Sequence, residues 1–297
     1  VVAVATTQCQ ERLPSINTDH LDHLYEEVLL ETGDSVGIIH IYAEHPDYRW
    51  VGDDDEGIAC IDDATRAAIF YLHHAENTGK DEHVRKAKMF MKLTLALKSE
   101  NGYFYNFIWD DRTIHKEGIT TINEPNWWSW RALWCLSEFL ESKLILSTDK
   151  LLYESMGAAR HKLIKRMLLD QNTASSFDEH QGISVPEWLP GKAAADQASL
   201  IILGLAPILE HGSPGLREYA QRMADGIMQL QVDSDGDWYD GAFLCWRNLW
   251  HGYGSSQAYA LLKISEALGE SRYREAALRE VETFYPALWN MGWLSSF

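Results

Sequence analysis

A small-residue start followed by an apolar run recurs four times along the chain, and this feature constrains the fold most. The four segments are DDATRAAIFYL, SWRALWCLSEFL, ADQASLIILGL and SSQAYALLKI, anchored at Ala64, Ala132, Ala198 and Ala258. Successive anchors are 68, 66 and 60 residues apart. Each interval holds one apolar helix, one more amphipathic helix and one long loop. Such a repeat is typical of stacked helical hairpins in which an outer helix wraps an inner one.

Helical periodicity runs through the whole chain and predicts an all-α fold. The apolar positions and the residues that flank them mark helices at 18–31, 60–79, 81–98, 126–142, 149–169, 193–211, 215–231, 255–268 and 272–285. The short β-branched segment GIIHIYA (37–43) is expected to be a strand or a buried loop. Small residues at the inner-helix starts would let those helices approach closely.

We expect one domain over residues 1–297, built as an (α/α)6-type toroid of helical hairpins. No Pro/Gly/Ser-rich linker or low-complexity tract divides the sequence. The predicted helices give four hairpins and one leading helix, which is fewer than a closed ring of six hairpins requires. The toroid is therefore incomplete, or short helices escape the pattern, or the chain is a fragment.

The charge balance excludes some classes of partner. The formal net charge is −18, and such a surface repels phosphate backbones and anionic lipids. Nucleic-acid binding is therefore not expected. No apolar run reaches the roughly 18 residues that span a membrane. The oligomeric state is left open by the sequence.

The N-terminal residues and the cysteines bear on the compartment. The start VVAVATTQC is either the end of a signal peptide leading to a lipid-modified Cys9 or an ordinary strand or coil, and the basic n-region is missing. A periplasmic or secreted location is slightly favoured over a cytoplasmic one. Cys60 and Cys135 lie in apolar helical runs and are expected to be buried free thiols. The cysteine spacing predicts neither a zinc site nor a disulfide framework.

Long loops rich in acids and aromatics precede the repeated helices, at 45–58, 99–125, 171–191 and 232–254. Loops of this length inside a compact domain are usually functional or disordered, and these are too aromatic for disorder. Gathered at one end of a helical toroid, they would form an active-site cleft.

Three phrases in order, EGIACIDDATRAAI, NGYFYNFIWDDRTI and WSWRALWCLS, resemble the six-hairpin glycosidase superfamily. They look most like bacterial (α/α)-barrel proteins of carbohydrate-utilisation loci, which carry a DDNARAL-type motif, a GRFHNF…YDRRW stretch and GRALWAL. The resemblance covers about residues 50–140 well and the rest through the helix pattern. It implies the toroid fold, whereas the superfamily includes hydrolases, lyases and epimerases. This chain departs from the pattern in reading DDAT, with Thr65 shifted, and in the stretch TINEPNWWSW.

Glycoside hydrolysis needs two carboxyl groups, one to protonate the leaving oxygen and one to activate water or attack the anomeric carbon. The family motif falls on Asp62 and Asp63, at the start of an inner helix. They are about 100° apart on a helix, so they cannot both point the same way. Asp62 alternatively forms only an ion pair with Arg66. Glu124 is the first candidate for the second catalytic carboxylate, with N-capping as its alternative role.

Other acids are reserve or binding candidates. Glu187 and Asp240 are reserve catalytic carboxylates. The acidic stretch 53–56 is interpreted as a solvated turn, a sugar-binding cluster or a calcium site, although it lacks EF-hand spacing. We predict no metal ion and no cofactor for the reaction.

Aromatic and polar side chains in the loops are the expected sugar contacts, because a sugar ring presents an apolar C–H face edged by hydroxyls. For each tryptophan, core packing is the alternative, since this residue is usually largely buried. The predicted substrate-binding residues are Asp55, Tyr105, Asp111, Trp127, Trp128, Trp188, Trp238, Trp250 and His251.

The sequence therefore predicts a glycoside hydrolase that acts on an oligo- or polysaccharide by carboxylate general acid/base catalysis. One alternative is a polysaccharide lyase on the same fold, which needs a Tyr or His base and positive charge against a uronate. The acidic loops supply that charge poorly. The other alternative is a non-catalytic carbohydrate-binding protein.

Overall fold

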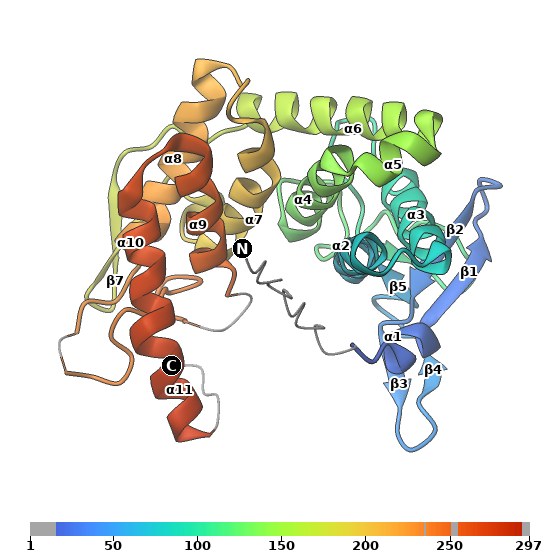
Figure 1. The fold of residues 1–297 in the computed structure, drawn as a ribbon, viewed down its shortest axis with the longest axis horizontal. Helices are drawn as coiled ribbons and strands as arrows, with labels where there is room; N and C mark the ends of the chain where they lie inside the picture. Colours follow the sequence, from blue (N-terminus) through green and yellow to red (C-terminus); the bar gives the residue numbers. More distant parts are fainter. Residues whose placement is uncertain (1–15, 235, 251–254, 293–297) are drawn as a thin grey trace, which may run out of the picture.

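The computed structural model of the chain describes residues 16–234, 236–250 and 255–292. Helices dominate these residues and follow one another around an open arc, with short strands at its edges (Figure 1). The predicted helical fold is confirmed in this coarse form. A closed ring of six hairpins is not confirmed, and the single domain over residues 1–297 stays a prediction.

The four helices with the repeated small-residue start pack against one another in chain order (Figure 1). They are α2 (Ile61–Thr78), α4 (Trp127–Glu141), α7 (Ala195–Leu205) and α9 (Gln257–Leu268). Each also packs against an outer helix that follows it in the chain. The outer helices are α3 (Asp81–Ala96), α6 (Lys150–Leu169), α8 (Pro214–Gln229) and α10 (Ser271–Arg279). The repeat in the sequence therefore corresponds to four hairpins.

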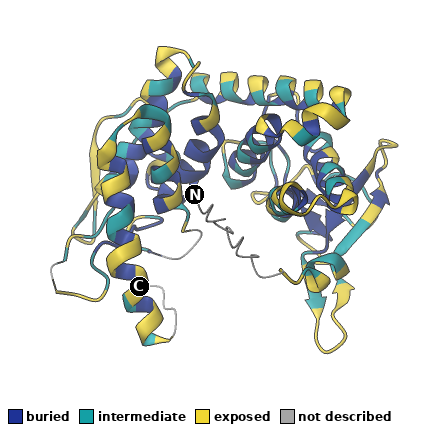
Figure 2. Ribbon diagram, in the orientation of Figure 1, coloured by how far each residue is buried: buried dark blue, intermediate teal, exposed yellow. Residues whose placement is uncertain are grey.

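The contact between α4 and α7 shows why small residues recur on the inner helices. A Cβ added at Gly204 would lie 2.5 Å from the Leu133 side chain, so only glycine permits this approach. Ser137 donates a hydrogen bond across the same contact to the Gly204 carbonyl, at 2.6 Å. Every residue of α7 is buried, as the dark ribbon in Figure 2 shows. Burial of each large aliphatic side chain contributes about 1.5–3 kcal/mol.

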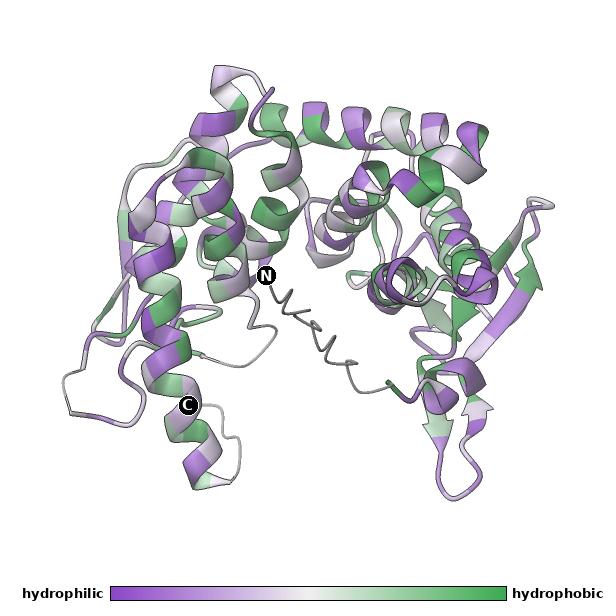
Figure 3. Cartoon of the chain, in the orientation of Figure 1, coloured by the Kyte–Doolittle hydropathy of each residue, from purple (hydrophilic) through white to green (hydrophobic). Residues whose placement is uncertain are grey.

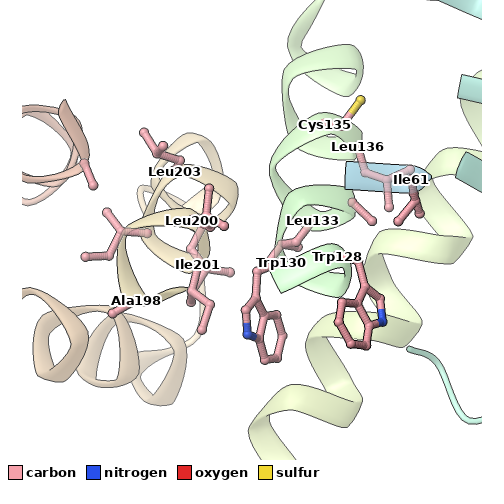
Figure 4. Close-up of a cluster of buried hydrophobic side chains, with 14 of the residues drawn as sticks. Ile61, Trp128, Trp130, Leu133, Cys135, Leu136, Ala198, Leu200, Ile201 and Leu203 are labelled. Carbon is pink, nitrogen blue, oxygen red and sulfur yellow. The ribbon is translucent and has the colours of Figure 1, made fainter. Parts of the chain in front are cut away.

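The same interface forms the centre of the hydrophobic core. Trp130 and Leu133 of α4 face the apolar side chains of α7, among them Leu200 and Ile201 (Figure 4). The outer helices are only half apolar: hydrophilic residues recur along α6 and α10 on the side away from the core (Figure 3). The layering of apolar inner and amphipathic outer helices agrees with the predicted hairpins.

The helix predicted over 18–31 is wrong. Only α1 (Asp19–His23) is helical there, and β1 (Tyr25–Leu29) then pairs antiparallel with β2 (Ser35–Ile39). Gly33, at φ +85°, allows the turn between them. The buried β-branched residues of β2 pack on α3. This packing stabilises the hairpin, although the local spacing of apolar residues also fits a helix. The strand interpretation of 37–43 is confirmed by β2 and β3.

Short strands accompany the helices, because the described residues include four two-stranded antiparallel sheets. Beyond β1–β2 they pair β3 (Tyr42–Glu44) with β4 (Arg49–Val51), β5 (Ala59–Cys60) with β6 (Phe107–Ile108), and β7 (Phe177–His180) with β8 (Ile183–Pro186). All of them lie in or beside the loops that precede the inner helices. They shape these loops without forming a common sheet.

Two predicted helices are divided, and one short helix was not predicted. This helix, α5 (Lys143–Thr148), lies between the helices predicted over 126–142 and 149–169, and α7 is followed by a 3-10 turn at Ala206–Ile208. Another 3-10 turn, Pro190–Lys192, precedes α7. The last predicted helix, 272–285, consists of α10, a π-helical turn at Glu280–Phe284 and α11 (Tyr285–Met291).

The cysteines and the helix lengths agree with the expectations from the sequence where they are described. Cys60 and Cys135 are buried free thiols, as predicted, and Cys245 is buried as well. Cys9, and with it the proposed processing site, lies outside the described residues. Among the helices of the described ranges, none combines the length and apolarity needed to cross a bilayer.

Candidate active site at the inner-helix starts

The first turn of α2 is fixed by the short sheet that precedes it. The Ile58 amide donates to the Ile108 carbonyl at 2.9 Å, and the Ile61 amide donates to the Asn106 carbonyl at 2.8 Å. Gly57, at φ +77°, passes so close to Ile108 that any Cβ would clash with its backbone. Cys60 caps the helix by accepting a bond from the Asp63 amide at 3.3 Å. The loop and the strand pair together set where the two aspartates emerge.

Asp62 and Asp63 are both engaged by arginine. Asp62 Oδ2 lies 3.2 Å from Arg66 Nη2, and its Oδ1 is ion-paired with Arg131 of the neighbouring α4. Asp63 Oδ1 is ion-paired with Arg66 as well. Its other oxygen, Oδ2, is in no ion pair among the described residues. The predicted Asp62–Arg66 pair is thus present, and only one oxygen of Asp63 is held by an arginine.

A buried carboxyl group lies on α7, the inner helix that follows α4. Asp196, in the first turn of α7, is 2% exposed. Its Oδ2 accepts a bond of 2.7 Å from the Trp127 indole, and its Oδ1 accepts one of 2.8 Å from the Gln197 amide. Burial raises the pKa of Asp196 to about 6, while these two bonds and the charge of Arg131 act in the opposite direction. A carboxyl group with its pKa raised to about 6 exchanges its proton near neutral pH.

Arg131 links the two acidic centres. It is 13% exposed, is ion-paired with Asp62, and its charge acts on Asp196. Further bonds join the same ends of the inner helices: Trp130 Nε1 donates to Gln197 Oε1 at 2.9 Å. On the other side of α7, the Ser199 and Ser256 hydroxyls are 2.7 Å apart. Neighbouring inner helices are therefore joined to one another near their first turns, from α2 through α4 and α7 to α9.

Sequence reasoning missed both Asp196 and Arg131 as site residues. Asp196 stands two positions before the anchor Ala198, as Asp62 stands two positions before Ala64. Comparing the repeats position by position would have found it. Arg131 occupies the position before its anchor, Ala132, where Asp63 stands in the first repeat.

Glu124 lies in the loop before α4 and is exposed. Its backbone carbonyl accepts a bond of 3.0 Å from Ser129 Oγ, whereas its carboxylate has no partner among the described residues. The N-cap of α4 is Asn126, whose side chain accepts the Trp127 amide at 2.9 Å. The N-capping alternative for Glu124 is thus wrong, and its catalytic role stays a prediction.

Two of the predicted sugar-stacking tryptophans belong to the core. Trp128 is 5% exposed, and its indole N–H bonds the Phe104 and Ile122 carbonyls at 2.9 and 3.1 Å. Trp250 is 4% exposed and packs edge-on against Phe284. Protein covers these rings, which corrects their assignment as sugar platforms.

The other predicted aromatic residues keep some exposure. Trp238 is 38% exposed and stacks on Phe284, with ring centroids 6.2 Å apart. Trp127, Trp188 and Tyr105 are half-buried. His251 lies outside the described residues.

Of the two predicted acidic contacts, Asp111 lines a shallow depression formed by the loops at 52–54 and 109–111, whereas Asp55 does not. Asp53 Oδ1 accepts the amides of Asp55 and Glu56, which makes this stretch a turn. Asp111 Oδ1 binds the amide and hydroxyl of Thr113. No group of three or more His, Cys, Asp or Glu side chains within the described ranges is arranged to hold a metal ion.

Both reserve carboxylates are held by local bonds. Glu187 Oε2 accepts the Ser176 hydroxyl at 2.5 Å. Asp240 Oδ1 accepts the Ser234 amide at 2.9 Å and an Arg279 N–H at 2.7 Å. These bonds stabilise the long loops. They tie the two carboxylates to Ser176, Ser234 and Arg279, none of which lies at the start of an inner helix.

Comparisons with known proteins give distant structural neighbours. No protein-family model and no curated protein matches the chain. A glycosyl hydrolase family 88 protein from Bacteroides vulgatus is similar at 10% identity and TM-score 0.41, over 60% of this chain and 51% of that one. A metagenome-derived glycoside hydrolase family 9 endoglucanase is similar at 13% identity and TM-score 0.40, over 84% of this chain and 59% of that one. The chain thus spans between half and three-fifths of these neighbours, and the function has to be argued from its own residues.

Proposed function

We propose that the protein is a glycoside hydrolase that cleaves an oligo- or polysaccharide with carboxyl groups from α2 and α7. One observation carries the proposal: the first turns of α2 and α7, which both pack on α4, hold acidic groups near Arg131 of α4, and the surroundings of these groups differ. Asp196 of α7 is buried with a raised pKa, whereas Asp62 and Asp63 of α2 are partly exposed and ion-paired with arginines. Carboxyl pairs whose environments differ in this way are the usual acid and base of glycoside hydrolysis.

Asp196 is the proposed general acid. With a pKa of about 6, it retains a proton in a useful fraction of molecules near neutral pH. A sugar bound over it would exclude water and disfavour the charged form further. The Trp127 N–H fixes the orientation of the carboxyl group.

Asp63 is the proposed base or nucleophile, because only its Oδ1 is ion-paired, with Arg66. Asp62 has both oxygens in ion pairs and is assigned a positioning role. Glu124, exposed and unpaired in its carboxylate, is the alternative second carboxylate. The toroid of the resembled superfamily supports this assignment through the order of the inner helices.

The two alternatives from the sequence are weaker. A lyase needs a basic tyrosine or histidine, yet burial and a bond to Asp170 raise the pKa of Tyr103 far above its ordinary value. Arg66 and Arg131 are already occupied by aspartates, so they are poorly placed to neutralise a uronate. A non-catalytic sugar-binding protein would not need a tuned carboxyl group.

The test is a screen of plant and microbial polysaccharides for newly formed reducing ends. Wild-type protein is expected to release them without a gain in absorbance near 235 nm, and Asp196→Asn and Asp63→Asn are expected to release almost none. Glu124→Gln is the control among the alternatives and is expected to stay within about twofold of wild type, since the two aspartates supply the proton transfers. Cleavage with a gain at 235 nm, or full activity of both aspartate variants, would contradict the proposal.

A further inference from the structure

A pocket is lined in part by Trp130 of α4. It has a volume of about 160 Å³ and opens above the C-terminal end of α6, between the segments that lead into α4 and α7. Trp130 lines it while donating to Gln197, the residue after Asp196. The Trp130 indole therefore joins the pocket to the residue that follows the proposed general acid.

The walls of the pocket are aromatic and rigid. Tyr103, Trp130 and Tyr219 are 2%, 2% and 6% exposed and form its floor. Trp188 is half-buried at the rim. Its indole N–H donates to the Arg222 carbonyl at 2.9 Å, and its ring meets Phe177 edge-on at 5.1 Å. The ring is held in place from two sides, so it presents a fixed surface to a ligand.

Polar side chains are concentrated on one side, directly after the last residue of α6. Asp170 Oδ2 accepts bonds from the Tyr103 hydroxyl at 2.9 Å and from Arg166 Nε at 2.6 Å. Gln171 Nε2 donates to the Leu168 carbonyl at 3.0 Å. Asp170 Oδ1 and Gln171 Oε1 have no partner among the described residues. Two acceptor oxygens of residues that line the pocket are therefore available to a ligand.

We propose that this pocket binds a single neutral pyranose unit, at a sugar site separate from the catalytic carboxyl groups. A pyranose fits because its C–H face packs on a fixed aromatic ring while its hydroxyls donate to Asp170 and Gln171. The volume is below the usual range for larger ligands, so one ring is held rather than a chain. This proposal rests on the proposed function only because that function indicates a carbohydrate as the ligand.

The charge of the pocket selects against acidic sugars. Asp170 is negative, and the C-terminal end of α6 carries partial negative charge from its unpaired carbonyls. A uronate would meet both. Lys192, at the rim, is 74% exposed in its side chain and is paired with Glu187, so it offsets this field only weakly.

The experiment is titration of the protein with methyl β-glucoside, methyl β-galactoside, methyl α-mannoside and methyl β-glucuronide, followed by ligand-observed NMR. At least one neutral glycoside is expected to bind in the millimolar range, and the glucuronide more weakly. Trp188→Leu is expected to raise Kd about tenfold and Gln171→Ala several-fold. Trp289→Leu and Gln229→Ala, at exposed positions outside the pocket, are matched controls that should leave Kd unchanged.

The variants also separate this site from the catalytic one. Asp196→Asn is expected to leave monosaccharide binding unchanged. If Trp188→Leu fails to fold by circular dichroism, Gln171→Ala carries the test, because its side chain lies outside the core. Absence of binding by every neutral glycoside, or unchanged Kd in Gln171→Ala, would overturn the proposal. If a neutral glycoside binds but the protein releases no reducing ends from any polysaccharide in the screen, the proposed enzyme is contradicted and this pocket is not.

Discussion

The first turns of α2 and α7 carry an aspartate at the same position of the repeat, and the two residues behave differently. Asp62 is 27% exposed in its side chain and is held between Arg66 and Arg131. Asp196 is 2% exposed, accepts an indole N–H, and has its pKa raised by burial to about 6. The repeat therefore places an aspartate at the start of each of these two helices. The residues of α4 that contact each aspartate, Arg131 and Trp127, give the two carboxyl groups different surroundings. This contrast makes the two turns suitable for separate roles in one reaction.

Asp196→Asn tests the contrast with the largest expected effect. The amide keeps the size of the side chain and removes the transferable proton, so kcat should fall at least about 100-fold, the usual contribution of a positioned general acid. The measurement is the rate of reducing-end release by the purified variant on the substrate found in the screen. A variant with more than a tenth of wild-type kcat would assign Asp196 to structure instead.

The same substitution should change how stability depends on pH. The folded-state pKa of Asp196, about 6, lies above the ordinary aspartate value of 3.8, so the native state binds more protons between these values. Its contribution to stability is greatest below pH 3.8 and is lost as pH rises through 6. At pH 8 the charged, buried carboxylate costs up to about 3 kcal/mol, because each pKa unit corresponds to about 1.4 kcal/mol.

Denaturant unfolding of wild type and Asp196→Asn at pH 5 and pH 8 measures this difference. The variant should gain stability relative to wild type as pH rises. Other buried acids such as Glu280, whose pKa is raised to about 7, titrate in both proteins and cancel in the comparison. Equal pH dependence in the two proteins would mean that Asp196 is ionised throughout.

Arg131→Met should cost about 1–3 kcal/mol of unfolding free energy, because it leaves the partly buried Asp62 without one of its partners. Loss of the positive charge should also raise the pKa of Asp196 further. The matched control is Arg49→Met, whose ion pair with Glu44 is largely exposed and is worth about 0–1 kcal/mol. Chemical denaturation compares the two, and equal losses would argue against a coupled site.

Trp127→Phe should have the smallest effect. It removes the indole N–H that stabilises the charged form of Asp196, so the pKa of this carboxyl group should rise and the alkaline limb of the pH–rate profile should move upward. Trp134→Phe is the control, because its indole N–H binds Glu138 on the same helix. A shift of the same size in both variants would mean that the Trp127 bond is not specific.

The inner helices and the two aspartates at the start of α2 could be predicted from local sequence. Small residues and apolar periodicity mark α2, α4, α7 and α9, and the resemblance marks Asp62 and Asp63. The hairpin β1–β2 could not be predicted in the same way. Its register depends on packing against α3, which is distant in the sequence, and the local spacing also fits a helix.

The candidate site was only half predictable for a related reason. Asp196 lies in the apolar run ADQASLIILGL and has no acidic neighbours to mark it. The pKa of its carboxyl group is raised by burial and lowered by the bond from Trp127, which is 69 residues away in the chain. Conversely, the acidic residues that stand out in the sequence, such as Asp53 and Asp111, are used in local turns. Prominence in the sequence and placement in the site are therefore different properties.

The pKa of Asp196 tests the central contrast most directly, and it requires no substrate. Protein labelled with ¹³C at the aspartate carboxyl carbons is titrated by NMR, and the Asp196 resonance is assigned by its loss in Asp196→Asn. We predict a midpoint near pH 6, with an upward shift in Trp127→Phe. A midpoint at or below about 4, the ordinary value for an aspartate, would contradict the assignment of Asp196 as the general acid.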